Sequence, residues 1–193
     1  MSTPTISTTW NRALRDQIDF HWQHQLRQRL EGLTDDEYFW EPVPDCWNVR
    51  PRGTGTAQMQ AGSGAMTIDF AFPEPDPTPV TTIAWRLGHV IVGVLAVRNA
   101  SHFGAAPTDY YSFDYAATAS QALSQLDAAY ATWQAGVESL GEDGLARPVG
   151  EAEGPFAELS YAELILHINR ELIHHLAEVC LLRDLYAHNR KGS

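Results

Sequence analysis

The sequence contains few cysteines. Its 193 residues include two, Cys46 and Cys180, which are far apart and form neither a CxxC pair nor the Cys/His spacing of a zinc finger. Secreted domains that are stabilised by disulfides usually carry more. We therefore expect a cytoplasmic protein in which Cys180 packs in the core. Cys46 follows two prolines in a loop and is a candidate for an exposed thiol.

Long apolar runs are also absent. The longest one, residues 90–97, is far shorter than the roughly 20 residues that cross a bilayer as a helix. The first nine residues have neither the basic start nor the apolar stretch of a secretory signal. We expect a soluble protein without membrane association.

Basic clusters are missing as well. The chain has 24 Asp and Glu against 13 Lys and Arg, which gives a net charge of −11 with neutral histidines. Proteins that bind nucleic acids neutralise phosphates with clustered Lys and Arg, so a nucleic-acid partner is not expected. The six Trp, seven Tyr and seven Phe argue against a disordered chain, because disordered segments are poor in aromatic residues.

Four stretches without internal proline have apolar residues at three- and four-residue steps. They predict helices over residues 9–33, 81–103, 117–140 and 160–188. Thr34 stands in an N-cap position, either Thr81 or Thr82 can act as the N-cap of the second long helix, and Gly141 is expected to end the third. Four helices with one apolar stripe each predict an all-α fold, namely a four-helix bundle formed by a single domain over residues 1–193.

The segment between the first two predicted long helices, residues 46–79, is rich in glycine and proline. Residues 57–60 and 65–72 flank a Gly-Ser-Gly turn and are consistent with a small β-hairpin. Loops of this length often cover a functional site. We expect this one near the open end of a pocket, with Trp47, Phe70 and Phe72 as walls.

The fourth predicted helix carries a pair of metal-ligand residue types. Glu171 and His175 are four residues apart, so their side chains lie one turn apart on the same face. A carboxylate that points toward a core costs several kcal/mol unless it is paired or binds a metal. His89 interrupts the most apolar part of the second helix, where Gly88 and Gly93 leave space beside it. One histidine and a Glu/His pair on facing helices predict a bundle metal site.

Other interpretations of these residues remain open at this point. His89 can be a hydrogen-bonded core histidine without a metal. A second stripe on the fourth helix offers His167, Glu171 and His174 as an alternative ligand set, or His174 as a residue that orients a ligand. Arg86 can hold an anionic substrate or form a salt bridge. His102 and His188 lie at predicted helix ends, where a cation complements the helix dipole.

Two stretches resemble the DinB/YfiT-like superfamily of four-helix-bundle metal proteins. One is Glu171-Leu-Ile-His-His175 with the apolar helix end after it, and the other is the segment 32–51 that follows the first helix. The resemblance implies that the metal ligands are His89, Glu171 and His175. Many members carry histidine at the position of Glu171, and the His/Glu/His variant is similar to the mycothiol-dependent maleylpyruvate isomerase branch, which binds zinc.

The resemblance implies a metal-dependent enzyme that acts on a small molecule. A low-molecular-weight thiol is the expected cosubstrate, and the reaction class is a thiol-dependent S-transfer or isomerisation. Zinc is the favoured divalent metal, and nickel or iron are alternatives, because two histidines and a carboxylate suit all three. The alternative function is a non-catalytic metal- or ligand-binding stress-response bundle. A homodimer is also expected from the resemblance.

Overall fold

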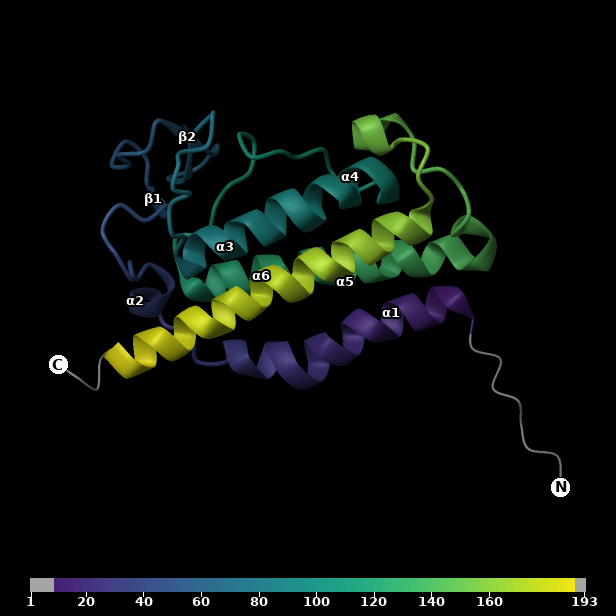
Figure 1. The fold of residues 1–193 in the computed structure, drawn as a ribbon, viewed down its shortest axis with the longest axis horizontal. Coiled ribbons are helices and arrows are strands. Elements are labelled where there is room, and N and C mark those ends of the chain that lie inside the picture. The colour runs from purple at the N-terminus through teal and green to yellow at the C-terminus, as the bar shows by residue number, and fades with distance from the viewer. Residues whose placement is uncertain (1–8, 190–193) are drawn as a thin grey trace, which may run out of the picture.

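Four long helical segments lie side by side in the computed structural model, which describes residues 9–189 (Figure 1). The first consists of α1 (Trp10–His21), a π-helical turn (Trp22–Leu26) and a 3-10 turn (Arg27–Leu30). The second consists of α3 (Ile83–His89), a π-helical segment η3 (Val90–Ala96) and α4 (Val97–Phe103). The third and fourth are α5 (Ala119–Gly144) and α6 (Tyr161–Asn189). Two shorter helices are α2 (Asp35–Tyr38) and the 3-10 helix η4 (Glu151–Phe156).

Threonine hydroxyls fix where three of the long segments begin. The hydroxyls of Thr9, Thr82 and Thr118 each accept a hydrogen bond from the backbone N–H three residues further on. Gly141 breaks α5 because its φ of +60° lies in the left-handed region. The N-cap at Thr82 is one of the two that the sequence offered, and the break at Gly141 agrees with the prediction. The first segment is shorter than predicted and ends at Leu30.

The long segments form a ring in which each contacts two neighbours. α6 packs against α1 and against the α3–η3 part of the second segment, while α5 packs against α1, η3 and α4. Ile168, Leu172 and Val179 of α6 are fully buried in the shared core. Each such side chain contributes about 1.5–3 kcal/mol through removal from water. The prediction of a mainly helical chain is confirmed, apart from a small sheet.

The sheet is formed by the long insertion between the first two helical segments. Its strands β1 (Val49–Pro51), β3 (Met66–Phe70) and β2 (Met59–Ala61) are antiparallel and lie in the order β1-β3-β2. The predicted hairpin corresponds to β2 and β3, with Ala61 opposite Ile68. Strand β1 was not predicted, because it is short and ends in a proline. A sheet accepts proline at its edge, where β1 lies.

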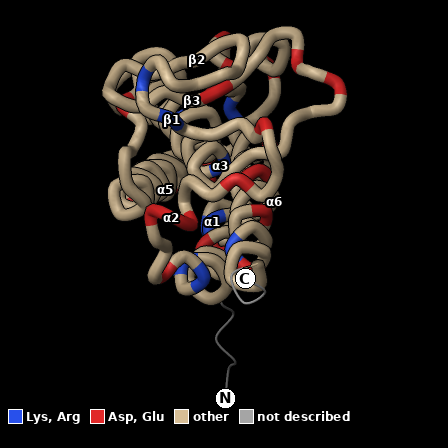
Figure 2. The backbone as a smooth tube through the Cα atoms, turned by 90° about the vertical axis from the view of Figure 1, so that its left-hand side faces the viewer, with Lys and Arg blue, Asp and Glu red and all other residues tan. Residues whose placement is uncertain are grey.

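Side chains and backbone tie this insertion to the start of α3. The indole Nε1 of Trp85 donates to the backbone oxygen of Asp69 at 2.7 Å, and the hydroxyl of Thr82 donates to the Asn48 side chain at 2.7 Å. Figure 2 shows the sheet stacked on the α3 end of the helices, with Lys and Arg scattered over the backbone in this view. The sheet is therefore fixed beside the helix that carries His89.

The structure corrects the expectation about one cysteine and agrees with the expectation about the other. Cys46 is buried, with 3% of its surface exposed, and its thiol donates to the backbone oxygen of Val43. It is therefore not an exposed thiol. Cys180 packs partly buried against the core, as expected. None of the helices within residues 9–189 combines the length and apolar character required to span a bilayer.

Candidate metal centre

His89 is the last residue of α3, and neighbouring side chains contact one face and one nitrogen of its ring. Trp85, one turn earlier, stacks on the imidazole at 5.5 Å between ring centroids. The hydroxyl of Tyr110, from the loop after α4, lies 2.7 Å from Nδ1 of His89. Gly93 makes this approach feasible, because a Cβ at this position would lie 2.0 Å from the Tyr110 hydroxyl. Nδ1 is thus engaged by the protein, and Nε2 is the nitrogen available to a metal.

Burial and neighbouring charges keep His89 neutral. Desolvation is the largest cause, followed by repulsion from His175 and from the positive charges of Arg86 and Arg98, and together they lower the pKa of His89 to about 4. Burial also raises the pKa of Tyr110 to about 12, so its hydroxyl stays protonated. A neutral imidazole with one nitrogen held by a hydroxyl is the form in which histidine binds metals.

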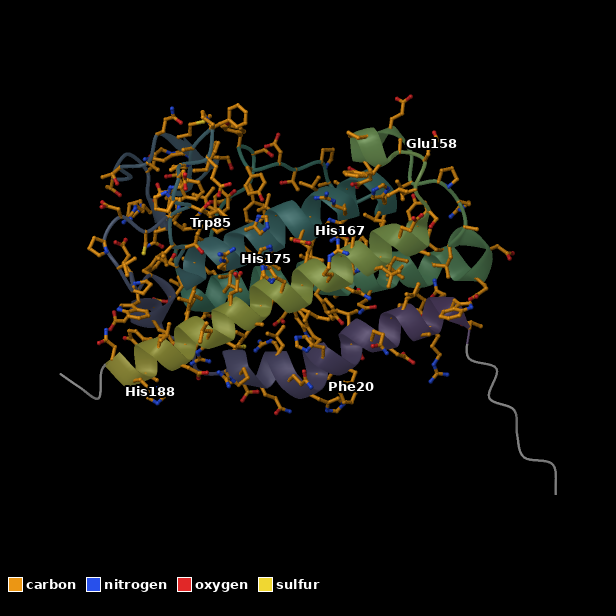
Figure 3. All side chains as sticks on the ribbon, in the orientation of Figure 1. Phe20, Trp85, Glu158, His167, His175 and His188 are labelled. Atoms are coloured by element: carbon orange, nitrogen blue, oxygen red, sulfur yellow. The ribbon has the colours of Figure 1, made fainter. Side chains whose placement is uncertain are left out.

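His175 faces His89 from α6. The two ring centroids are 4.7 Å apart and the ring planes are almost perpendicular. Imidazoles that share one ion at about 2.1 Å have centroids about 5 Å apart, so the spacing of these rings fits a common ligand. Figure 3 shows His175 on α6 beside α3, with Trp85 behind it toward the sheet.

Glu171 lies next to His175 on α6. Its Oε2 is 3.4 Å from Nε2 of His175. Two ligand atoms on one tetrahedral ion at about 2.1 Å are separated by about 3.4 Å, so this pair also fits a divalent metal. The carboxylate of Glu171 lies at the edge of the core, with 29% of its side chain exposed. Among the described residues, no hydrogen bond or ion pair joins Glu171 directly to His89.

Glu178 engages the other nitrogen of His175. Its Oε2 is 3.0 Å from Nδ1 of His175 and 3.2 Å from the Arg86 guanidinium, which itself lies 3.3 Å from the same Nδ1. Nδ1 cannot donate to the carboxylate and accept from Arg86 at once. The carboxylate is the closer partner, at 3.0 Å against 3.3 Å for the guanidinium, so we assign the proton to Nδ1. This tautomer leaves Nε2 as the metal-binding atom, on the side of Glu171.

Three metal-ligand residues that lie close together in the described part of the chain differ from the predicted set, because they include neither His89 nor Glu171. His174, His175 and Glu178 each offer one ligand atom, and these atoms lie within 4.8 Å of one another. This group combines the predicted ligand His175 with His174, which the sequence offered as a residue that orients a ligand, and with Glu178. His174 is 62% exposed, and Glu178 already forms a salt bridge with Arg86. A cation at 3.2 Å competes with a metal for that carboxylate.

The alternative set on the second stripe is also partly assembled. Nδ1 of His167 lies 3.6 Å from Oε1 of Glu171, while His174 approaches Glu178 at 3.6 Å. His167 and His174 thus contact different carboxylates. His102, expected to need no role beyond its helix end, is buried and bonded to Glu153 at 2.9 Å.

An apolar cavity of about 250 Å³ opens beside His89. Its walls come from the sheet, from α3 and from the loop after α4, and they include Phe70, Trp85, Tyr110 and Tyr111. The expectation that the insertion lies near the predicted site agrees with this arrangement. Phe70 lines the cavity as expected, but Phe72 is 81% exposed and does not, and Trp47 packs behind Trp85 at 5.8 Å.

Comparison with known proteins identifies the family. A sequence model described as the DinB superfamily matches residues 17–179. The chain belongs to the DinB superfamily. No curated protein and no solved structure matches the chain. The match is at the level of the superfamily, so membership of the mycothiol-dependent isomerase branch stays a prediction.

In this DinB-superfamily chain, three residues contact the histidines of the candidate site without having been predicted from the sequence to do so. Trp85, Tyr110 and Glu178 each touch one of the two histidines. Tyr110 lies in an irregular loop, where no periodicity indicates its direction. Glu178 carried a usable signal, because it follows His175 by three residues on one helix face.

Proposed function

We propose that this chain is a metal-dependent enzyme that acts on a small molecule. Its divalent ion, with zinc favoured and nickel or iron as alternatives, binds His89, Glu171 and His175 inside a four-helix bundle. One observation carries the proposal: His89 and His175 face each other, and the protein engages the Nδ1 atom of both rings. Paired histidines with this support are typical of metal sites.

The number of protein ligands favours catalysis over a structural role. Structural zinc sites usually have four protein ligands, whereas three leave a position for water or substrate. A divalent ion supplies Lewis acidity there and lowers the pKa of a bound water or thiol. The residues around it complete the site: the aromatic cavity beside His89 takes the apolar part of a substrate and excludes water.

The reaction class rests on family resemblance. A low-molecular-weight thiol as cosubstrate, in an S-transfer or an isomerisation, is the proposal that the His/Glu/His ligand set favours. Both cysteines are poor candidates for the nucleophile, because burial raises the pKa of Cys46 and of Cys180. A thiol nucleophile would therefore come from a cosubstrate.

Metal analysis tests the proposed ligand set. Purified protein is stripped with a chelator, reloaded with zinc, and its metal content measured for the wild type and for His89→Ala, Glu171→Gln and His175→Ala. We expect about one ion per chain in the wild type and a loss in each variant. Thiol conjugation to an electrophile, with and without zinc, then tests the enzymatic part. A wild-type protein that takes up no zinc, nickel or iron would refute the proposal.

The second candidate is a non-catalytic metal site formed by α6 alone. It is favoured by the proximity of His174, His175 and Glu178. The two ligand sets share His175 and differ elsewhere, so two variants separate them. His174→Ala removes the ion if α6 alone binds it and leaves the ion in place if our set is right. Glu171→Gln has the opposite effect.

The remaining expectations stay predictions. These are the cytoplasmic location, the single domain over residues 1–193, the absence of nucleic-acid and membrane partners, and the homodimer. Large apolar side chains are exposed along α6 at Ile173, Leu181 and Leu185, and such a stripe is the face that a second copy of the chain would cover.

A further inference from the structure

A larger cavity of about 460 Å³ lies along the first half of α6. It is bounded by α6, by α4 and by residues 149–159, which include η4. In Figure 3, the labelled Glu158 marks this loop and His167 marks the neighbouring part of α6. No residue of the proposed metal set lines this cavity, and the sequence analysis assigned it no role.

Exposed apolar side chains form its walls. Phe156 is 61% exposed, Leu166 54% and Leu159 41%, and all three line the cavity. Single exposed apolar residues are common, but several around one hollow are typical of a site that binds an apolar group. The wall formed by η4 is held in place, because Glu153 bonds to His102 and to Arg98 of α4 at 2.9 and 3.4 Å.

The polar groups of the cavity favour an anion over a cation. Glu153 uses one oxygen for His102 and the other for Arg98. Glu163 uses Oε2 to bond the backbone and hydroxyl of Ser160 at 2.8 Å, where it caps α6. Both oxygens of Glu153 and one oxygen of Glu163 therefore already accept from donors of the protein.

Arg170 is in the opposite situation. A guanidinium has five N–H donors, and the described contacts of Arg170 are one hydrogen bond to Nδ1 of His167 and an approach of 3.8 Å to Glu171. Its remaining donors point to no acceptor that the described residues supply. Its side chain is 69% exposed at the rim of the cavity. It can bind a carboxylate without loss of an existing strong pair.

The cavity adjoins the proposed metal site. His167 and Arg170 line it, and both approach Oε1 of Glu171, at 3.6 and 3.8 Å. On the other side, Arg98 lines it and donates to the backbone oxygen of Gly93, one turn after His89. A ligand in this cavity therefore lies next to the residues that hold the ion.

We infer that this cavity binds a small organic carboxylate with an apolar body, whose acid group is held by Arg170 and whose body packs on Phe156 and its neighbours. As a binding site it is independent of the metal. Its role as the subsite for the acidic part of a substrate rests on the proposed function.

Three ligands with the same phenylbutyl body test the inference: 4-phenylbutyrate, 4-phenylbutanol and 4-phenylbutylamine. Their binding is measured by calorimetry with the metal-free and the zinc-loaded protein. We expect the carboxylate to bind most tightly and Arg170→Gln to weaken it about tenfold, with the alcohol unaffected. Phe156→Ala should weaken all ligands that bind, by about tenfold.

Matched controls separate these effects from general ones. Arg12 on α1 is also 69% exposed, and Phe20 on α1 is 59% exposed; neither lines the cavity. Arg12→Gln and Phe20→Ala should leave binding unchanged. Tighter binding of the amine than of the carboxylate, or equal losses in Arg170→Gln and Arg12→Gln, would overturn the inference. If the carboxylate binds but the protein takes up no metal, the inferred carboxylate site is supported and the proposed metal-dependent enzyme is refuted.

Discussion

The hydroxyl of Tyr110 determines which nitrogen of His89 is available to a metal. Loss of a group that orients a metal-bound histidine typically costs 10- to 100-fold in affinity. We predict that Tyr110→Phe weakens zinc binding by about this factor, measured by competition with a chelating dye, while helix content is unchanged. Tyr111→Phe is the control, because Tyr111 lines the same cavity without a bond to His89. Equal affinities of the two variants would contradict the assignment.

The protonation of His89 has a consequence for stability in the absence of metal. Its pKa is about 4 in the folded chain and 6.5 when exposed, so the unfolded chain binds more protons between these values. The free energy of unfolding should therefore fall as the pH falls from 6.5 to about 4. We predict that His89→Gln reduces this pH dependence in urea titrations with chelator present. The same pH dependence in the wild type and in His89→Gln would contradict this prediction.

At the scale of single residues, the candidate ligands could be predicted from the sequence, but the residues that contact them were not predicted. His89, Glu171 and His175 stand out because polar groups interrupt helical apolar patterns. The role of Tyr110 could not be predicted, since the direction of a loop side chain depends on tertiary packing. Cys46 was mispredicted for the same reason: tertiary packing buries it, although its prolines and polar neighbours are typical of exposed loops.

The second helical segment and the loop after it approach each other closely at Gly93. Ala usually stabilises a helix by about 1 kcal/mol relative to Gly. Here the new Cβ would lie 2.0 Å from the Tyr110 hydroxyl and 3.2 Å from Nδ1 of His89, so the loop must move. We predict that Gly93→Ala lowers the free energy of unfolding by about 1–3 kcal/mol in urea titrations.

A double variant tests the cause of this loss. Tyr110→Ala removes the ring that the new methyl group would meet, so Gly93→Ala should cost less in its presence. The two substitutions are then non-additive, as expected for residues in contact. If the losses in the free energy of unfolding are additive, the destabilisation by Gly93→Ala does not come from its contact with Tyr110.

The elements were predictable to the extent that their signals are local. Thr82 and Gly141 mark helix boundaries through caps and backbone conformation, which depend on a few neighbouring residues. The strand β1 depends on pairing with β3, whose partner residues lie 15 to 19 positions further along, and its three residues carry no pattern of their own. The π-helical segment η3, which begins directly after His89, has no recognisable sequence signal either.

In the whole molecule, the proposed ion would join two helices that are distant in sequence. His89 belongs to α3, while Glu171 and His175 belong to α6. A ligand that binds the folded state at 100 times its dissociation constant adds about 2.7 kcal/mol of stability. For a chain of this size, this corresponds to an increase in Tm of about 5–10 °C. Zinc should produce this increase in the wild type and none in His89→Ala.

Amide hydrogen exchange with and without zinc would distinguish which helices the proposed ion stabilises. An ion bound by α3 and α6 should slow amide exchange in both, because opening either helix then requires release of a ligand. An ion bound by His174, His175 and Glu178 touches one helix and should protect α6 without an added effect of His89. We therefore predict that zinc protects α3 in the wild type and in His174→Ala. Protection confined to α6, retained in His89→Ala, would move the metal from the facing helices to the surface of α6.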